Sequence, residues 1–342
     1  MTYLKSSPSG GNALMLISFN MASNKPTNFK EFCRSLDLTV SNKKCLEVLV
    51  LIDENDEDMR NAVAAEKKRR AFKIKSLEWP ANGYFELWRG LNKLHRLCDP
   101  KAYFVCNIND EIRFRTSAWD EKLEKYVGFF PDDIFRLCTS VSKYRNYSDF
   151  WECGYAPENY PIATKKWIDL QLDWGACHGP DAFQQFVSFY LSRCNWPDKN
   201  QYCRDIPVED ISIVGEGAYI GMEEGAMWHR VRKGWKTWHK ITSVRMQVEA
   251  SRRATLLYLN ILIVKNKWED TEIKLESFSL RLKCRNKKTG ETYFKKSYLV
   301  NAFLIFWLNF IRRPKKYYHC GGNPPPFKYT ACGSFLKLLF RA

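Results

Sequence analysis

The chain has 342 residues, 45% of them apolar, and can therefore bury a core for one large domain or two smaller ones. Its twelve cysteines are scattered, with no Cys-x-x-Cys pair and no His-x-x-x-His spacing, which argues against a disulfide framework or a zinc finger. The first apolar run, residues 13–19, is too short for a membrane span and lacks a signal-peptide cleavage pattern. We therefore expect reduced thiols and a cytoplasmic protein.

The net charge of +16 is distributed unevenly along the chain. Residues 1–251 contain 35 Lys and Arg against 33 Asp and Glu, whereas residues 252–342 contain 19 against 5. This excess of +14 is the clearest boundary signal in the sequence. We predict a main domain over residues 1–250 and a basic, aromatic-rich extension of unknown fold over residues 251–342.

Strand and helix patterns alternate through the first 110 residues. Apolar runs predict strands over residues 13–19, 46–52, 72–77 and 102–107. Helical spacing of apolar residues predicts helices over residues 27–38, 57–70 and 84–98, the first capped by Thr27 or Asn28 with Glu31 in a capping box. This alternation is typical of an α/β fold with a mostly parallel, Rossmann-like central sheet and flanking helices, which binds ligands at the carboxyl ends of its strands.

Acidic and amide side chains directly follow two of these strands. The run 46–52 leads into Asp53, and the run 102–107 leads into Asn109, Asp110 and Glu111. Because the carboxyl ends of parallel strands meet at one edge, Asp53 and Asp110 should lie at the same edge, where carboxylates can hold a divalent cation against a phosphate. No glycine fingerprint follows the first strand and no Walker motif occurs, so the predicted nucleotide site is of another kind.

Residues 17–36 resemble the opening of family-2-type glycosyltransferases with the A-type fold. In that family a strand leads into an Asn-Arg-Pro turn and a helix that ends in Ser-Leu; here the turn reads Asn24-Lys25-Pro26 and residues 35–36 are Ser-Leu. The resemblance implies a nucleotide-diphospho-sugar donor, with a UDP-sugar expected. The donor-binding residues that it implies are Ser18, Asn24, Lys25, Asp53, Asn92 and Asn109.

The same resemblance implies a metal. In the family, a later strand ends in an Asp-x-Asp metal motif, and residues 107–111, Asn-Ile-Asn-Asp-Glu, occupy that place. Asp110 and Glu111 are the implied ligands of Mn²⁺ or Mg²⁺. An Asn replaces the usual first Asp, and because it carries no charge we expect weaker metal binding.

Residues 174–185 resemble the family's acidic motif at the start of a helix, whose carboxylate is the catalytic base in inverting members. Asp181 takes that position, and His178 is expected to assist it or to contact phosphate. A helix N-terminus keeps an Asp ionised and aimed. The implied reaction is inverting transfer of a sugar to a hydroxyl of a glycan, lipid or protein, with residues 161–169 bordering the acceptor.

Simpler explanations stay open for these residues. Asp53 fits a solvated loop before a helix, residues 109–111 fit an ordinary turn, and Asp181 fits a plain helix cap. A metal-dependent nuclease built on Asp53, Asp110 and Glu111 is one alternative to the glycosyltransferase.

Two segments outside the resemblance bear on partners. Residues 228–240 interleave cations with aromatic rings, a pattern that fits nucleic-acid binding or contacts to a diphosphate and an anionic acceptor. Residues 298–316 combine a long apolar run with a basic cluster, which fits either peripheral contact with an anionic membrane or a buried helix. A basic nucleic-acid-binding protein is therefore the other alternative, although the nucleotide site favours the glycosyltransferase.

Overall fold

The computed structural model describes part of the chain, and the statements below concern that part. The described residues are 15–81, 86–139, 160–175, 180–193, 204–208, 210–215, 244–265, 271–274, 282–286 and 292–295. His178 and the segments 228–240 and 298–316 lie outside them.

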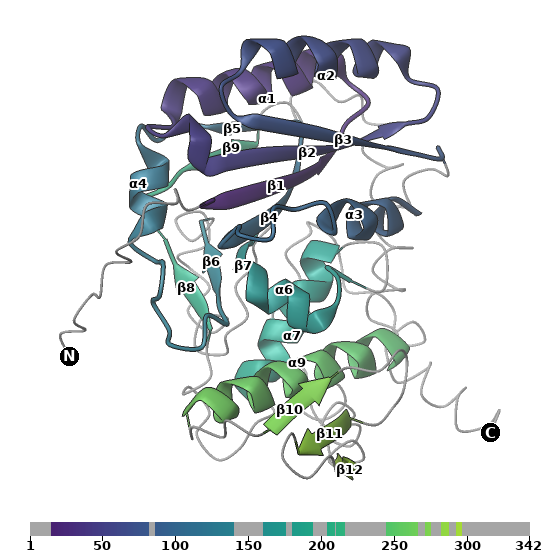
Figure 1. Ribbon diagram of the computed structural model, residues 1–342, viewed down its shortest axis with the longest axis vertical. Helices are drawn as coiled ribbons and strands as arrows, with labels where there is room; N and C mark the ends of the chain where they lie inside the picture. Colours follow the sequence, from purple (N-terminus) through teal and green to yellow (C-terminus); the bar gives the residue numbers. More distant parts are fainter. Residues whose placement is uncertain are drawn as a thin grey trace, which may run out of the picture.

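A seven-stranded sheet forms the centre of the molecule, in the order β3-β2-β1-β4-β7-β6-β8 (Figure 1). Its strands are β1 Ile17–Ala22, β2 Leu46–Asp53, β3 Lys73–Trp79, β4 Phe104–Asn109, β6 Arg136–Cys138, β7 Ile162–Thr164 and β8 Asp205–Pro207. The neighbours β3–β2, β2–β1, β1–β4 and β6–β8 are parallel, and the two pairings of β7 are antiparallel. The predicted α/β class with a mostly parallel central sheet is confirmed.

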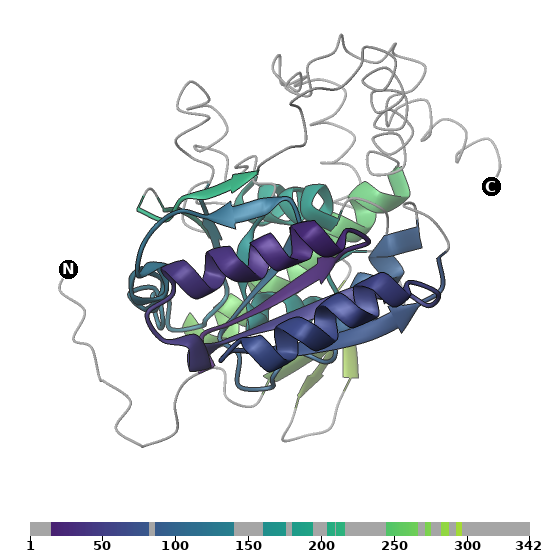
Figure 2. The ribbon, with the colours of Figure 1, turned by 90° about the horizontal axis from the view of Figure 1, so that it is seen from above.

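Helices cover both faces of this sheet. On one face α1 Pro26–Thr39 and α2 Glu57–Arg69 lie side by side (Figure 2). On the other face lie α3 Leu87–His95, α6 Lys165–Gln171, α7 Pro180–Arg193 and α9 Val244–Lys265 (Figure 1). Each face has its own cluster of buried apolar side chains, with Phe29 and Phe32 of α1 in one and Trp167, Phe183 and Leu257 in the other.

Smaller elements complete the described part. A 3₁₀ turn, Lys43–Cys45, precedes β2, and α4, Trp119–Glu124, follows β5, Ile112–Phe114. β5 pairs antiparallel with β9, Ile213–Gly215. A separate three-stranded antiparallel sheet consists of β10 Thr271–Lys274, β11 Leu282–Asn286 and β12 Thr292–Lys295.

The first helix begins earlier than predicted. Lys25 is its N-cap residue, and Pro26 occupies the first turn, where a missing N–H costs nothing and the fixed φ suits the helix. The capping box predicted at Thr27 or Asn28 is therefore wrong, because both residues already lie inside the helix. By contrast, α2 begins as its sequence predicts, with the Asp56 carboxylate accepting a hydrogen bond from the Met59 N–H at 2.9 Å.

The predicted boundary at residue 250 falls inside α9. This unbroken helix of 22 residues buries Ala250, Ala254, Leu257 and Ile261 in the same cluster as α3, α6 and α7. The first part of the predicted extension therefore belongs to the main folded unit. No described helix is long and apolar enough to cross a membrane.

Candidate functional site

The carboxyl ends of β2, β1 and β4 lie next to one another, as the sequence predicts. Ala22 at the end of β1 pairs with Leu51 of β2 on one side and with Asn109 of β4 on the other. Asp53 and Asp110 therefore lie on either side of the β1–α1 turn, two strand spacings or about 10 Å apart. This edge brings together side chains that are more than fifty residues apart in the sequence.

The Asp110 carboxylate is the most buried charge at this edge, with 7% of the residue exposed. The Ser23 hydroxyl donates a hydrogen bond to Asp110 Oδ2 at 2.6 Å, and no described cation forms an ion pair with the carboxylate. Burial raises the pKa of Asp110, and the hydrogen bond from Ser23 offsets only part of this effect. The charge of Lys25 also lowers this pKa, but the carboxylate is held in place without a direct ion pair to a described cation.

The β1–α1 turn presents cationic and polar groups beside these carboxylates. Asn24 is exposed. The Lys25 ammonium, 57% exposed, lies 3.4 Å from Glu111 Oε1. The Lys25 N–H donates to the Ser23 hydroxyl at 3.3 Å, so Ser23 connects the turn to Asp110. A loose, exposed ion pair of this kind can rearrange around a ligand at little cost.

Two of the predicted donor residues are the last residues of their strands at the same edge. Asp53 ends β2, is partly buried, and pairs in register with Trp79 of β3. Asn109 ends β4, and its side-chain oxygen accepts a hydrogen bond from the Glu111 N–H at 3.2 Å. Asn109 therefore makes the hydrogen bond to the backbone two residues further on that is typical of Asn in turns.

Two other predicted donor residues are engaged inside the fold. Ser18 is fully buried in β1 and donates to Glu47 at 2.5 Å. Asn92 is buried on α3, and its amide bonds to the backbone of Trp174 and Gly175. The polar groups of both side chains thus already have partners within the protein.

Asp181 lies in the first turn of α7, which begins at Pro180, so the predicted position at a helix start is confirmed. Gly175 lies against this turn, because a Cβ at Gly175 would be 3.4 Å from Pro180 Cα. The segment before α7 is therefore packed directly on the helix start that carries Asp181.

The carboxylates present fit a metal that is shared with a ligand. No group of three or more His, Cys, Asp or Glu in the described residues could form a complete protein cage for a metal. Mg²⁺ and similar ions at nucleotide sites commonly use one or two carboxylates together with phosphate oxygens. The buried carboxylate of Asp110, with Glu111 next to it, meets that requirement.

Sequence reasoning did not assign a role to Ser23 or to Asn107. The Ser23 hydroxyl donates a hydrogen bond to Asp110, and its place directly before the Asn-Lys-Pro turn was the available signal. Asn107, in β4, is buried with both polar side-chain atoms lacking a hydrogen-bond partner. Such an amide is costly inside a protein, and no sequence pattern distinguishes it from its neighbours.

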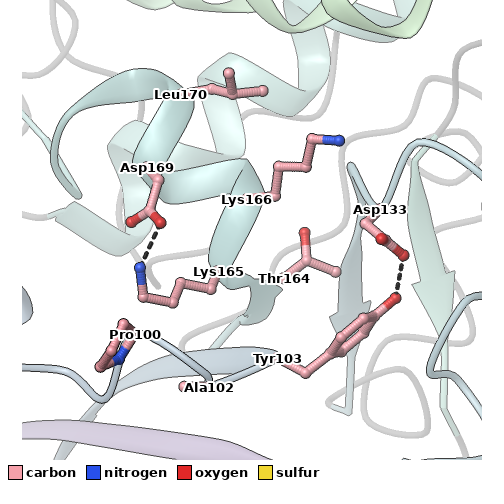
Figure 3. Close-up of a pocket in the computed structure, with 9 residues that line it drawn as sticks. All are labelled: Pro100, Ala102, Tyr103, Asp133, Thr164, Lys165, Lys166, Asp169 and Leu170. Carbon is pink, nitrogen blue, oxygen red and sulfur yellow. Dashed lines mark hydrogen bonds and ion pairs between the residues drawn. The ribbon is translucent and has the colours of Figure 1, made fainter. Parts of the chain in front are cut away.

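A hollow of about 370 Å³ lies at the opposite edge of the sheet (Figure 3). Tyr103 and Asp133 form a hydrogen-bonded pair in its wall, and Lys165 pairs with Asp169. Because Thr164 of β7 pairs with Phe104 at the start of β4, the hollow is roughly 20 Å from Asp110 along that strand. Part of segment 161–169, predicted to border the acceptor, thus lines a hollow at the start of β4 that is remote from Asp110.

No protein-family model and no curated protein matches the chain. Among solved structures it is similar to the mannosyltransferase PcManGT from Pyrobaculum calidifontis in complex with GDP-Man and Mn²⁺, with a TM-score of 0.47, 10% identity, and 76% of each chain covered. It is also similar to S. aureus TarS 1–349 in complex with UDP-GlcNAc, with a TM-score of 0.43, 12% identity, and 81% of this chain and 99% of that chain covered. The galactosyltransferase LgtC gives a TM-score of 0.32, 15% identity, and coverage of 44% and 58%.

Proposed function

We propose that this protein is a glycosyltransferase of the A-type fold that takes a sugar from a nucleotide-diphospho-sugar. One observation carries the proposal: Asp53 on one side of the β1–α1 turn, and Asp110 with Glu111 on the other, at the carboxyl edge of a parallel sheet. That edge is where open α/β sheets bind nucleotides. The resemblance of residues 17–36 to family-2-type glycosyltransferases supports the same donor class.

The donor's parts correspond to the groups along this edge. The Asp53 carboxylate would accept hydrogen bonds from the base or ribose, since it is partly buried beside Trp79. Lys25 would leave Glu111 to contact the diphosphate, because their ion pair is long and exposed. A Mn²⁺ or Mg²⁺ ion bound by Asp110 and Glu111 would neutralise the diphosphate as a leaving group. UDP is the proposed nucleotide.

The acceptor half of the reaction is assigned to α7. Asp181, in the first turn of α7, would accept the proton of an acceptor hydroxyl as that oxygen forms a bond to the anomeric carbon. Attack opposite the departing diphosphate inverts the anomeric configuration. We propose a glycan, lipid or protein acceptor, with His178 assisting Asp181, and peripheral membrane contact through residues 298–316 in a cytoplasmic enzyme.

The first test is nucleotide-dependent thermal stabilisation. A ligand that binds only the native state raises its stability, so UDP with Mn²⁺ should raise the melting temperature by several degrees at saturation. Asp110→Asn removes the charge but keeps an oxygen for the Ser23 hydroxyl, so it should fold and lose the Mn²⁺-dependent part of the shift. GDP in place of UDP would correct the base, whereas no shift with any nucleoside diphosphate would contradict the proposal.

The two alternatives fare differently. A metal-dependent nuclease built on Asp53, Asp110 and Glu111 needs these carboxylates together, but in the described residues they do not form a metal-binding group, and the end of β1 separates Asp53 from the other two. Nucleic-acid binding rests on segments outside the described residues. It predicts steeply salt-dependent affinity for DNA or RNA, which gel-shift titration between low and physiological salt would detect.

A further inference from the structure

The turn at residues 172–175, which follows α6, is held by a side chain from α3. Asn92 Nδ2 donates to the Gly175 carbonyl at 2.8 Å, and Asn92 Oδ1 accepts from the Trp174 N–H at 3.1 Å. The amide therefore pairs with this backbone as a neighbouring strand would. Both ends of the amide are used, and Asn92 is 9% exposed.

Side chains from α7 and α9 hold the same turn. Gln184, fully buried on α7, donates to the Trp174 carbonyl at 2.7 Å. Arg253 of α9 donates to the Asp173 carbonyl at 3.1 Å and to its carboxylate at 2.6 Å. Three helices thus supply partners for successive backbone groups from Asp173 to Gly175.

The turn is in contact with the start of α7. A Cβ on Gly175 would meet Pro180 Cα at 3.4 Å and the Phe183 ring at 3.5 Å. The Arg253 guanidinium also lies over the Phe183 ring, 5.0 Å from its centroid. Arg253 therefore touches both the turn and the first turns of the helix that carries Asp181.

We propose that Asn92, Gln184 and Arg253 are positioning residues that fix the start of α7, and with it Asp181. This inference rests on the proposed function, in which Asp181 is the general base. A base acts only within hydrogen-bond reach of its proton, and a displacement of about 1 Å can cost about 100-fold in rate. On this view Asn92, which the resemblance assigns to the donor, acts on the acceptor half of the reaction, and α9 is part of the enzyme's working structure.

The test begins with Asn92→Asp, which is nearly isosteric. It keeps an oxygen for the Trp174 N–H but replaces the donor to the Gly175 carbonyl with a second oxygen, so one hydrogen bond becomes a repulsion. We expect kcat for sugar transfer to fall about 10-fold to 100-fold, with the donor KM and the UDP-dependent thermal shift within about twofold of wild type. Asn260→Asp is the matched control, because among the described residues the Asn260 side chain bonds to the Leu256 carbonyl of its own helix and not to the turn, and its kcat should stay at the wild-type value.

A double-mutant cycle separates positioning from general structural damage. If Asn92 acts through Asp181, then adding Asn92→Asp to Asp181→Asn should lower the residual rate no further. Arg253→Lys should give a smaller loss of kcat with the same lack of additivity, because Lys keeps the charge but has a single nitrogen, whereas Arg253 bonds to Asp173 through Nη1 and to Glu249 through Nε. If Asn92→Asp does not fold, the same cycle with Arg253→Lys decides.

The possible failures are distinguishable. Wild-type kcat in Asn92→Asp with normal UDP binding would overturn the inference and leave the proposed function intact. A raised donor KM with unchanged kcat in Asn92→Asp would mean that Asn92 acts in the donor site. If Asn92→Asp lowered kcat as much in the Asp181→Asn background as in the wild type, the positioning role would also be overturned. Absence of any nucleotide binding by the wild-type protein would instead reject the proposed function.

Discussion

The two sides of strand β1 bury different kinds of side chain. Because neighbouring residues on a strand point to opposite faces, β1 directs Phe19 and Met21 toward α1 and α2, and Ser18 and Asn20 toward α3. Both faces of the sheet have an apolar cluster, but the α3 side of β1 adds buried polar side chains to it. Buried polar groups cost stability unless they are paired, so the hydrogen bonds of Ser18 with Glu47 and of Asn20 with Cys98 are needed to keep this side stable.

The largest effect should come from the face covered by α1 and α2. Phe19 has ring contacts with Phe32, Phe114 and Trp119, with centroids 5.4 to 6.1 Å apart. Phe19→Ala should lower the free energy of unfolding by about 4 kcal/mol, through lost burial and the cavity left behind. Urea denaturation measures this loss, and Phe19→Leu should recover more than half of it. A loss under about 1 kcal/mol would mean that this face is not tightly packed.

The second effect belongs to α9 and depends on pH. Burial raises the pKa of Glu249, but hydrogen bonds and charge from Arg252 and Arg253 outweigh it and bring the pKa below its usual value of 4.5. The folded state therefore gains stability above pH 4.5, and the gain is lost as the pH falls through the lower folded pKa. Glu249→Gln should cost about 2 kcal/mol at pH 7. Urea titrations at pH 7 and pH 3 should show the difference shrinking in acid; a constant difference would contradict the ion-pair account.

A third prediction concerns the unpaired amide on the face covered by α3. Asn107→Leu should raise the free energy of unfolding by about 1 kcal/mol, because it replaces two unpaired polar atoms with apolar ones of similar size. Asn20 is the matched control. It pairs with Asn107 in register, and its side-chain oxygen accepts a hydrogen bond from Cys98 at 3.3 Å, so Asn20→Leu should destabilise the protein. Thermal unfolding of both variants measures the difference, and equal changes in stability would contradict the explanation that, of these two amides, only that of Asn107 is unpaired.

The smallest effect should come from the turn before α7. Leu172 has a φ of +72°, in the left-handed region that favours glycine, and it is 55% exposed. Leu172→Gly should therefore raise the free energy of unfolding by about 0.5 kcal/mol. Leu172→Ala loses the same side-chain contacts without relieving the backbone, so it should not stabilise. Any gain in the Ala variant measured by urea denaturation would contradict the explanation.

The parallel half of the fold was predictable because its strands are long and continuously apolar. Such runs are typical of strands covered on both sides, and they placed β2 and β4 within two residues of their observed bounds. Strands of three residues, such as β7 and β8, carry too little pattern to predict. The site could be predicted only where a residue ends or follows a strand, as Asp53 and Asp110 do. The contact from Ser23 to Asp110 joins residues 87 apart, and the contact from Asn92 to Gly175 joins residues 83 apart, so neither leaves a periodic signal in a single sequence.

The course of α9 through residue 250 has a practical consequence for shortened versions of the protein. The charge composition of the chain changes near residue 250, but α9 stays buried on both sides of that residue. Charge composition therefore does not mark the end of the folded unit. A chain cut at residue 250 would leave Asp173 without its guanidinium and expose the apolar surface that Leu257 and Ile261 cover. Loss of activity after such a cut would report a damaged fold. Only a chain that extends through Lys265 can reveal what the basic segment beyond it contributes.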